Sequence, residues 1–173
     1  MDNGFKSLKG QLLLDSGNLA GSFFMRTVVL VCEHTAEGAL GLVLNRQSKN
    51  TVGEMILADL PEQVNEQELF VGGPVQEGAL SYLHSDDFLP DANIMPNLSL
   101  NHSLQDLLDL GESFSVTQKV RVFTGYSGWG PGQLEVEMER KSWIVHQANL
   151  NHIFEVTPEK LWRSVMIEKG GVH

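Results

Sequence analysis

The sequence contains only one cysteine, Cys32, and no long apolar run. One cysteine cannot form a disulfide within the chain, a pattern typical of proteins from a reducing compartment. No stretch approaches the ~18 consecutive apolar residues of a membrane-spanning helix. Residues 1–11 also lack the apolar segment of a signal peptide. We therefore expect a soluble, cytoplasmic protein that does not associate with membranes.

Positive charge is scarce as well, because 12 Lys and Arg residues stand against 22 Asp and Glu residues. The net charge is −10 and the sequence pI is about 4.9, and the basic residues are scattered along the chain. A surface of this charge repels a phosphate backbone unless a local basic patch overcomes the repulsion. Direct nucleic-acid binding is therefore not expected.

Repeats, low-complexity tracts and Pro/Gly/Ser-rich linkers are absent too. A chain of 173 residues fits the usual size of one domain, roughly 100–200 residues. Its composition, 42% hydrophobic and 20% charged, is that of an ordinary globular protein. These features predict one compact domain over residues 1–173, and the oligomeric state stays open.

Two runs rich in β-branched and aliphatic residues, Arg26–Cys32 and Ala39–Leu44, predict neighbouring strands. The connection between them contains Gly38, which suits the turn of an antiparallel hairpin. Both runs are apolar at consecutive positions, so both faces of each strand should be covered. The hairpin is therefore expected near the centre of a sheet.

The hairpin would separate two polar clusters. Glu33 and His34 would lie beside its turn, whereas Asn45 and Arg46 would lie at the opposite end near Arg26. Six residues at ~3.3 Å each put roughly 20 Å between the clusters. The two clusters are therefore not expected to form one active site.

The rest of the chain predicts a mixture of strands and short helices. A capping box at Thr51–Glu54 predicts a helix that stops before Pro61. Ser103 is expected to cap a second helix that ends at Gly111. Pro158 is expected to begin a last helix that ends at Gly170. Further strands are expected at Leu8–Leu14, Leu69–Val71, Ala79–His84, Lys119–Thr124, Trp143–Val145 and Ile153–Val156, with a loop over 85–98 that includes a short strand near Ile94.

A glycine-rich stretch, Gly125–Gly132, leads into an acidic segment, Gln133–Lys141. The alternation of Leu134, Val136 and Met138 has the period of a strand. The proline before the segment and its i,i+4 charge pair are instead typical of a helix. The residues alone leave both alternatives open.

Four segments in this order and spacing resemble the AlgH/YqgE family of bacterial proteins over nearly the whole chain. They are RTVVLVCEHTAEGALGLVLNR (Arg26–Arg46), FVGGPVQEGALSYLH (Phe70–His84), GYSGWGPGQLEVEM (Gly125–Met138) and the closing pair HIFEV and EKLW. The sequence departs from the family pattern at Leu14–Ser16, where a Met-Pro is frequent, and at Gln47, where a proline is frequent.

The resemblance implies an α+β fold of coiled, mixed and largely antiparallel β-sheets with a few flanking helices. It favours a helix for Gln133–Lys141. Some family members are described as transcriptional regulators, notably of exopolysaccharide synthesis. The resemblance supplies no catalytic residues.

Three groups of residues could carry chemistry. Cys32 and His34 could form a nucleophile and its base, although a buried structural cysteine is the commoner arrangement. Arg26 and Arg46 could hold an anion or pair with carboxylates, and the 22 acidic residues favour pairing. His84 with Asp86 and Asp87 could bind a metal, but a solvated turn is favoured, and no metal or cofactor is expected.

The glycine-rich stretch is the remaining candidate. Its backbone could cradle a ligand at Gly128 and Gly130, beside Tyr126 and Trp129. It lacks the G-x-G-x-x-G spacing and the P-loop lysine, so we favour glycines that allow both aromatic side chains to pack against the sheet.

We therefore expect a regulatory or protein-interaction module that influences transcription indirectly, through unidentified protein partners, rather than an enzyme. The alternative is a small-molecule-binding protein, or an unassigned enzyme, with a pocket at Gly125–Gly132.

Overall fold

The computed structural model describes residues 5–17, 22, 24–56, 58–112 and 115–170. The strands are β1 (Gln11–Asp15), β2 (Val28–Thr35), β3 (Gly38–Val43), β4 (Gln47–Thr51), β5 (Glu68–Val71), β6 (Val75–Ser85), β7 (Leu98–Asn101), β8 (Lys119–Trp129) and β9 (Trp143–Gln147). The helices are α1 (Val52–Met55), α2 (Glu62–Asn65), α3 (Leu104–Glu112), α4 (Gln133–Glu139), α5 (Leu150–Phe154) and α6 (Pro158–Gly170).

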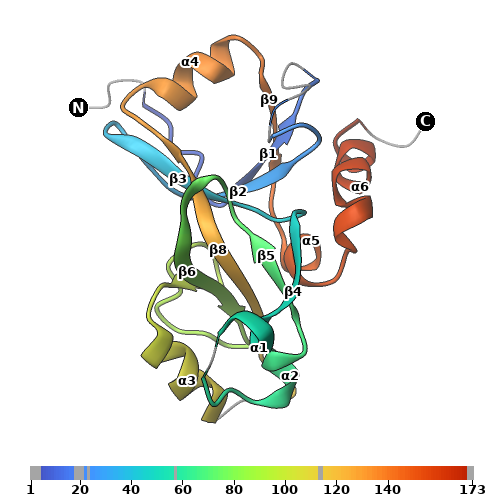
Figure 1. Cartoon of the computed structure of the whole chain (residues 1–173). Coiled ribbons are helices and arrows are strands. Elements are labelled where there is room, and N and C mark those ends of the chain that lie inside the picture. Colours follow the sequence, from blue (N-terminus) through green and yellow to red (C-terminus); the bar gives the residue numbers. More distant parts are fainter. Residues whose placement is uncertain (1–4, 18–21, 23, 57, 113–114, 171–173) are drawn as a thin grey trace.

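The described strands form one mixed sheet in the order β4-β5-β8-β3-β2-β1-β9, and β6 pairs with β7 and β8. Only β5 and β8 run parallel; the other pairs are antiparallel. The long strand β8 joins two halves of the molecule (Figure 1). Its first part pairs with β5 and β6, and its last residues, from Ser127 to Trp129, pair with β3. This arrangement confirms the expected α+β class with mixed, mostly antiparallel sheet.

The predicted hairpin is present, with Thr35 opposite Gly38 and Val29 opposite Val43. It lies inside the sheet between β8 and β1, as expected. Consecutive residues of β2 pack on opposite faces: Leu30 joins the cluster beneath α5 and α6, and Val31 joins the cluster beneath α4. Both faces are therefore covered, because burying apolar side chains on each face removes their surface from water.

Three apolar clusters fill the molecule. The largest packs the sheet against α5 and α6, and includes Leu161 and Val165 of α6. A second packs α4 against the opposite face through Leu134. The third, which we call the lower cluster, lies among α1, α2 and α3 at the other end of β8 (Figure 1) and consists of Val52, Leu60, Val64, Leu69, Tyr82, Leu107, Val120 and Val122.

The glycine-rich stretch is not a loop up to Trp129, because those residues continue β8. Gly73 crosses β8 so closely that a Cβ would meet the backbone carbonyl of Tyr126, and Gly125 has φ +70° with the carbonyl of Gly73 beside it. Both positions need glycine, since a side chain would collide with backbone. The glycines therefore serve the crossing of two chain segments.

Several other predictions need correction or refinement. The segment Ile153–Val156 is not a strand, because Asn149 and His152 form a capping box that begins α5. The helix after Thr51 has the predicted capping box but ends at Met55, and Pro61 instead caps α2. Ser103 does bond the N–H of Asp106, but α3 continues past Gly111.

The open question about the acidic segment is settled as a helix, α4, which begins after Gly132 in the left-handed conformation at φ +74°. Strands β4 and β7 and helix α2 have no counterpart in the sequence prediction, and the segment near Ile94 has a single isolated bridge, Met95 to Leu98, instead of a strand. Among the described residues, no helix is long and apolar enough to cross a membrane.

Candidate functional site

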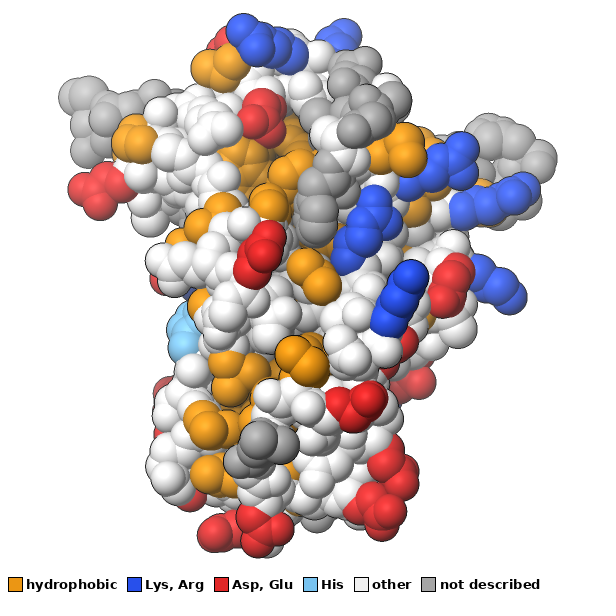
Figure 2. Space-filling model, viewed as in Figure 1, with side chains coloured by type: hydrophobic (Ala, Val, Ile, Leu, Met, Phe, Trp, Pro, Cys, Tyr) orange, Lys and Arg blue, Asp and Glu red, His pale blue; other side chains and the backbone are white. Residues whose placement is uncertain are grey.

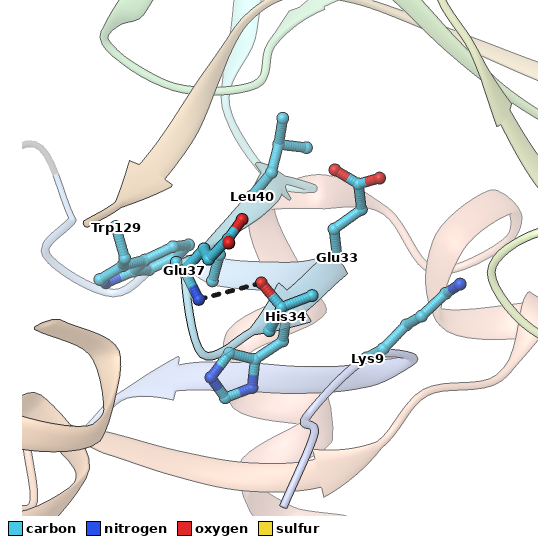
Figure 3. A pocket seen from close by; sticks show the side chains of 9 residues that line it. Lys9, Glu33, His34, Glu37, Leu40 and Trp129 are labelled. Atoms are coloured by element: carbon cyan, nitrogen blue, oxygen red, sulfur yellow. Dashed lines mark hydrogen bonds between the residues drawn. The ribbon is translucent and has the colours of Figure 1, made fainter. Parts of the chain in front are cut away.

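An open groove of about 420 Å³ lies at the turn of the β2–β3 hairpin. We call it the hairpin groove. Its lining includes Lys9, Glu33, Glu37, Leu40 and Trp129 (Figure 3). One side chain is basic and two are acidic, and Leu40 and Trp129 supply apolar surface. The groove thus combines charge with an apolar wall at the turn of a hairpin held by neighbouring strands.

A β-bulge separates the candidate nucleophile from the candidate base. Val31 pairs with Gly41 and Glu33 pairs with Leu40, so Cys32 is the extra residue on its strand. Because a bulge resets the alternation of side chains, Cys32 faces the cluster beneath α5 and α6, whereas His34 lies against Glu135 of α4. The two side chains therefore do not form a catalytic pair.

Cys32 is fully buried, and its Sγ lies 3.6 Å from the carbonyl oxygen of Leu30. Burial raises the pKa of the Cys32 thiol strongly, and the neighbouring carboxylate of Glu33 raises it further. A nucleophilic cysteine needs the opposite shift, because the thiolate is the reactive form. Cys32 is therefore a structural side chain.

His34 is held from several sides. Its Nδ1 accepts a hydrogen bond from the N–H of Leu8 at 2.9 Å, and its ring meets that of Phe5 edge-on. A neutral ring with Nδ1 as acceptor carries its proton on Nε2, which lies 3.5 Å from a carboxylate oxygen of Glu135. In Figure 3 the imidazole points away from Leu40 and from the carboxylate of Glu33. Its Nε2 has no hydrogen-bond partner among the described residues, so the ring links β2 to the N-terminal segment and lies beside α4 without bonding to it.

The aromatic residues of the glycine-rich stretch mainly pack inside the molecule. Trp129 is 7% exposed, and its indole N–H donates to Glu137 of α4 at 3.0 Å. Tyr126 is partly buried against the largest cluster. Gly128 lies opposite Leu40 in the β3–β8 ladder, and the N–H of Gly130 donates to the side chain of Gln133. Only Trp129 of this group lines the hairpin groove.

The two arginines chosen from the sequence line one pocket at the other end of the hairpin, together with Asn45 and the start of α6. Arg46 donates from Nη2 to the carbonyl oxygen of Met25 at 2.6 Å. The guanidinium of Arg26 has no carboxylate within 4 Å among the residues that the structure describes, although the carboxylate of Asp15 accepts from its backbone N–H. The hairpin groove and this pocket share no lining residue, which agrees with the expected separation of the two polar clusters.

The group of His84, Asp86 and Asp87, for which a solvated turn was favoured over a metal site, does not bring its ligand atoms together; Asp86 accepts hydrogen bonds from the Asp87 N–H and from Thr117. Within the described part of the chain, the one group that brings three potential metal ligands together is His146, His152 and Glu168, whose ligand atoms lie within 4.8 Å of one another. Sequence reasoning missed this group, because its members lie on β9, α5 and α6.

Hydrogen bonding around His152 disfavours a metal ion there. Its Nδ1 accepts from the N–H of Asn149 at 3.3 Å, and its Nε2 lies 3.0 Å from Glu168. A neutral ring bonded in this way donates from Nε2. A metal on Nε2 would force the proton onto Nδ1, where it would face another N–H. The group is therefore better suited to a hydrogen-bonded link between α5 and α6.

Two further residues, Trp162 and Arg163, line the same pocket as Arg26 and Arg46 but were not predicted. They follow Pro158 by four and five residues, one turn into α6. The proline that marks the helix start could have indicated that side chains from this turn lie beside its N-terminus. Nothing in the sequence places that turn next to Arg26, because all the elements from β2 to α5 separate them along the chain.

Comparisons with known proteins agree on the family. The AlgH-like family profile matches residues 12–173. The chain is 38% identical over 168 residues to a UPF0301 protein of Cytophaga hutchinsonii, covering 94% of this chain and 90% of the relative. It is also 38% identical over 175 residues to one of Chlorobaculum parvum, covering 99% and 92%.

Solved structures show the same architecture. The solution structure of the AlgH protein from Pseudomonas aeruginosa superposes with a TM-score of 0.79 at 27% identity, covering 100% of this chain and 94% of that one. A crystal structure of a protein from Corynebacterium diphtheriae gives 0.78 at 22% identity, covering 97% and 90%, and so supports the fold alone. On the matched profile and on relatives that cover almost its full length, this chain belongs to the AlgH-like (UPF0301) family.

Proposed function

We propose that the protein is a non-catalytic regulatory module of the cytoplasm, which influences transcription indirectly by binding protein partners. The observation that carries the proposal is the separation of Cys32 from His34 by the bulge in β2. The hairpin groove then offers a charged and apolar surface without the nucleophile and base that its sequence suggested. Binding is the activity that such a groove supports.

The charge of the chain supports action through proteins. At a net charge of −10, the molecule as a whole repels nucleic acid. The resemblance to proteins described as transcriptional regulators supports the regulatory part of the proposal. An acidic groove with an aromatic wall suits a partner segment that carries basic and apolar side chains, since complementary charge favours encounter.

The alternative, a small-molecule site built from Gly125–Gly132, has less support. Gly125 to Trp129 form strand backbone, and Trp129 is 7% exposed. A thermal-shift ligand screen on the protein and on Trp129→Ala tests it. A ligand that stabilises the protein but not the variant would favour this alternative over protein docking.

Affinity capture from the native cell tests the proposal. The bait is compared with a groove variant, Glu33→Lys with Glu37→Lys, and with a control, Glu62→Lys with Glu66→Lys on α2. Both double variants change the net charge by the same amount. We expect a partner that the protein and the control retain and the groove variant loses. Tight, sequence-specific binding of duplex DNA by the purified protein at physiological salt would contradict indirect action.

A further inference from the structure

We propose a second site, an oxyanion-binding pocket between the open end of the β2–β3 hairpin and the start of α6, which takes a small molecule that carries a phosphate group. The pocket measures about 390 Å³, and its charged lining residues are Arg26, Arg46, Glu159 and Arg163. We call it the arginine pocket. It shares no lining residue with the hairpin groove, so its test is independent of the proposed function.

The arginine pocket concentrates positive charge on an acidic protein. Three of the 12 basic residues of the chain line it, against one carboxylate, which leaves two net positive charges. In Figure 2, Lys and Arg side chains gather over α6 and beside β4, whereas Asp and Glu dominate the end around α1 and α2. Such a patch attracts an anion locally even though the whole molecule has a charge of −10.

Arg26 is held by side chains on both sides of its backbone. Its N–H donates to Asp15 at 2.6 Å, and its carbonyl oxygen accepts from Asn45 at 3.0 Å. Asp15 is itself 2% exposed. Arg26 has φ +54°, a left-handed conformation that disfavours residues with a Cβ. Strain of this kind persists where the surroundings fix it, and it is frequent at binding sites.

The guanidinium of Arg26 is also placed by α6. Its Cζ lies 5.3 Å from the ring centroid of Trp162, a cation–π distance, and the indole N–H of Trp162 donates to the carbonyl oxygen of Asp15 at 3.1 Å. The guanidinium groups of Arg26 and Arg163 have no carboxylate within 4 Å in the described part of the chain. The contact with Trp162 positions one guanidinium without neutralising its charge.

The start of α6 adds to the positive electrostatic potential of the arginine pocket. The helix has 13 residues and begins at Pro158, which lines the pocket. Pro158 has no N–H and the N–H of Lys160 donates to the carbonyl oxygen of Thr157, so the helix contributes mainly the partial positive charge of its dipole at this end. Glu159 in the first turn opposes this effect. The arginines therefore carry the site, and the helix end supports them.

Phosphate fits this set of groups better than a single carboxylate does. A guanidinium presents a planar fork of donors that matches phosphate oxygens. A phosphate monoester carries about −1.5 to −2 charges at neutral pH, which balances the two net positive charges of the lining, whereas one carboxylate carries −1. At about 390 Å³, the pocket also has room for the organic part of a small phosphate ester.

The probes are phenyl phosphate and inorganic phosphate, with benzoate as the carboxylate analogue, added at constant ionic strength. Isothermal titration calorimetry measures affinity, and two-dimensional NMR shows whether the amides around Arg26 and Trp162 shift. The variants are Arg26→Gln and Arg163→Gln. Lys160→Gln is the matched control, because it removes one positive charge from an exposed residue of α6 that does not line the pocket.

We expect phenyl phosphate to bind more tightly than benzoate. Each pocket variant should weaken binding by about 10- to 100-fold, the value of a charge-assisted hydrogen bond, and Lys160→Gln should change it less than about threefold. Thermal melts of each variant check that the fold is kept. No amide shift at the pocket with either phosphate, or equal weakening by Lys160→Gln, would overturn the site. Equal affinity for benzoate would overturn the phosphate assignment.

Discussion

At the scale of single residues, the close crossing of Gly73 and β8 gives the sharpest expectation. Gly73→Ala should lower the free energy of unfolding by about 2–4 kcal/mol, because the new methyl group collides with backbone that cannot rotate away. Gly78→Ala is the control: it has nothing within 4 Å and no positive φ, so it should be neutral or slightly stabilising. Urea unfolding of both variants decides the matter, and equal stability would contradict a rigid crossing.

Cys32 supplies a chemical prediction. Since burial raises the pKa of its thiol, reaction with DTNB at pH 8 should wait for opening of the structure. We expect the native protein to react at least about a hundredfold more slowly than the protein in urea. Rapid, stoichiometric labelling of the native protein would show an accessible thiolate and reopen the question of catalysis.

The residue types themselves predicted only part of the roles of the glycines, Cys32 and His34. Backbone geometry was favoured as the role of the glycines, and Gly125 requires it, but the sequence does not reveal that Gly73 and Gly125 meet each other. The separation of Cys32 from His34 depends on a bulge. A bulge is a property of the pairing between two strands, and no residue type in β2 predicts it.

At the scale of elements, one carboxylate ties α4 to two strands. Oε1 of Glu137 accepts the indole N–H of Trp129 at 3.0 Å and that of Trp143 at 2.8 Å. Glu137→Ala should lower the free energy of unfolding by about 1–3 kcal/mol, because two buried donors lose their acceptor. It should also change tryptophan fluorescence.

Glu139→Ala is the matched control for α4, because Glu139 is an exposed residue at the end of the same helix. We expect a change within about 0.5 kcal/mol for this surface substitution. Similar losses for the two variants would mean that helix propensity, and not the link to the tryptophans, governs the effect.

The type of an element could be predicted where local sequence signals agreed. The prediction failed where tertiary contacts determined whether a segment forms a helix or a strand. The capping box at Thr51 and the proline at Pro158 were identified because they act within one turn. The strand predicted at Ile153–Val156 is wrong, because the prediction relied on β-branched residues and did not consider the Asn149–His152 capping box that begins α5. The alternation after Gln133 fitted a strand, yet the segment forms α4, in which Leu134 is buried against the sheet and Val136 is exposed.

The link between α5 and α6 predicts a dependence of stability on pH. Hydrogen bonds, first from His152 and then from His146, lower the pKa of Glu168. A lowered carboxylate pKa stabilises the fold above the ordinary glutamate pKa of about 4.3, and the contribution is lost as pH falls through the lowered value. Glu168→Gln should therefore be less stable than the parent at pH 6–7, with the difference vanishing in strong acid.

The expected difference is modest, about 0.5 kcal/mol, because the Glu168 side chain is 47% exposed and solvent screens the interaction. Thermal melts of both proteins between pH 2 and pH 7 measure it, with Glu139→Gln as a control for the loss of one surface charge. A difference that grows as the pH falls would contradict the assigned direction.

At the scale of the whole molecule, the strand order and the grouping of charged side chains depend on contacts between segments that are far apart along the chain. The mixed sheet was predicted as a class, because the apolar runs and turns appear in the sequence. The strand order could not be predicted, because the parallel pairing of β5 with β8 and the pairing of β9 with β1 join segments that are far apart along the chain. The arginine pocket has the same origin, because three separate segments contribute its charges.

The shared strand β8 predicts that the two halves unfold together. None of the three tryptophans belongs to the lower cluster, since Trp129 and Trp143 lie beneath α4 and Trp162, a residue of α6, packs against the largest cluster. Leu69→Ala removes a side chain that is 1% exposed from the lower cluster, and it should cost about 2–5 kcal/mol. If β8 transmits the loss, tryptophan fluorescence and far-UV circular dichroism will both shift to lower urea by the same amount.

The control is Val116→Ala, at a fully exposed position, which should leave both transitions in place. An unshifted fluorescence transition in Leu69→Ala, beside a shifted dichroism transition, would show two halves that unfold separately. Coincident shifts would mean that a ligand or partner bound at either end of the β2–β3 hairpin stabilises the lower half as well, because ligand that binds only the folded state stabilises the whole cooperative unit.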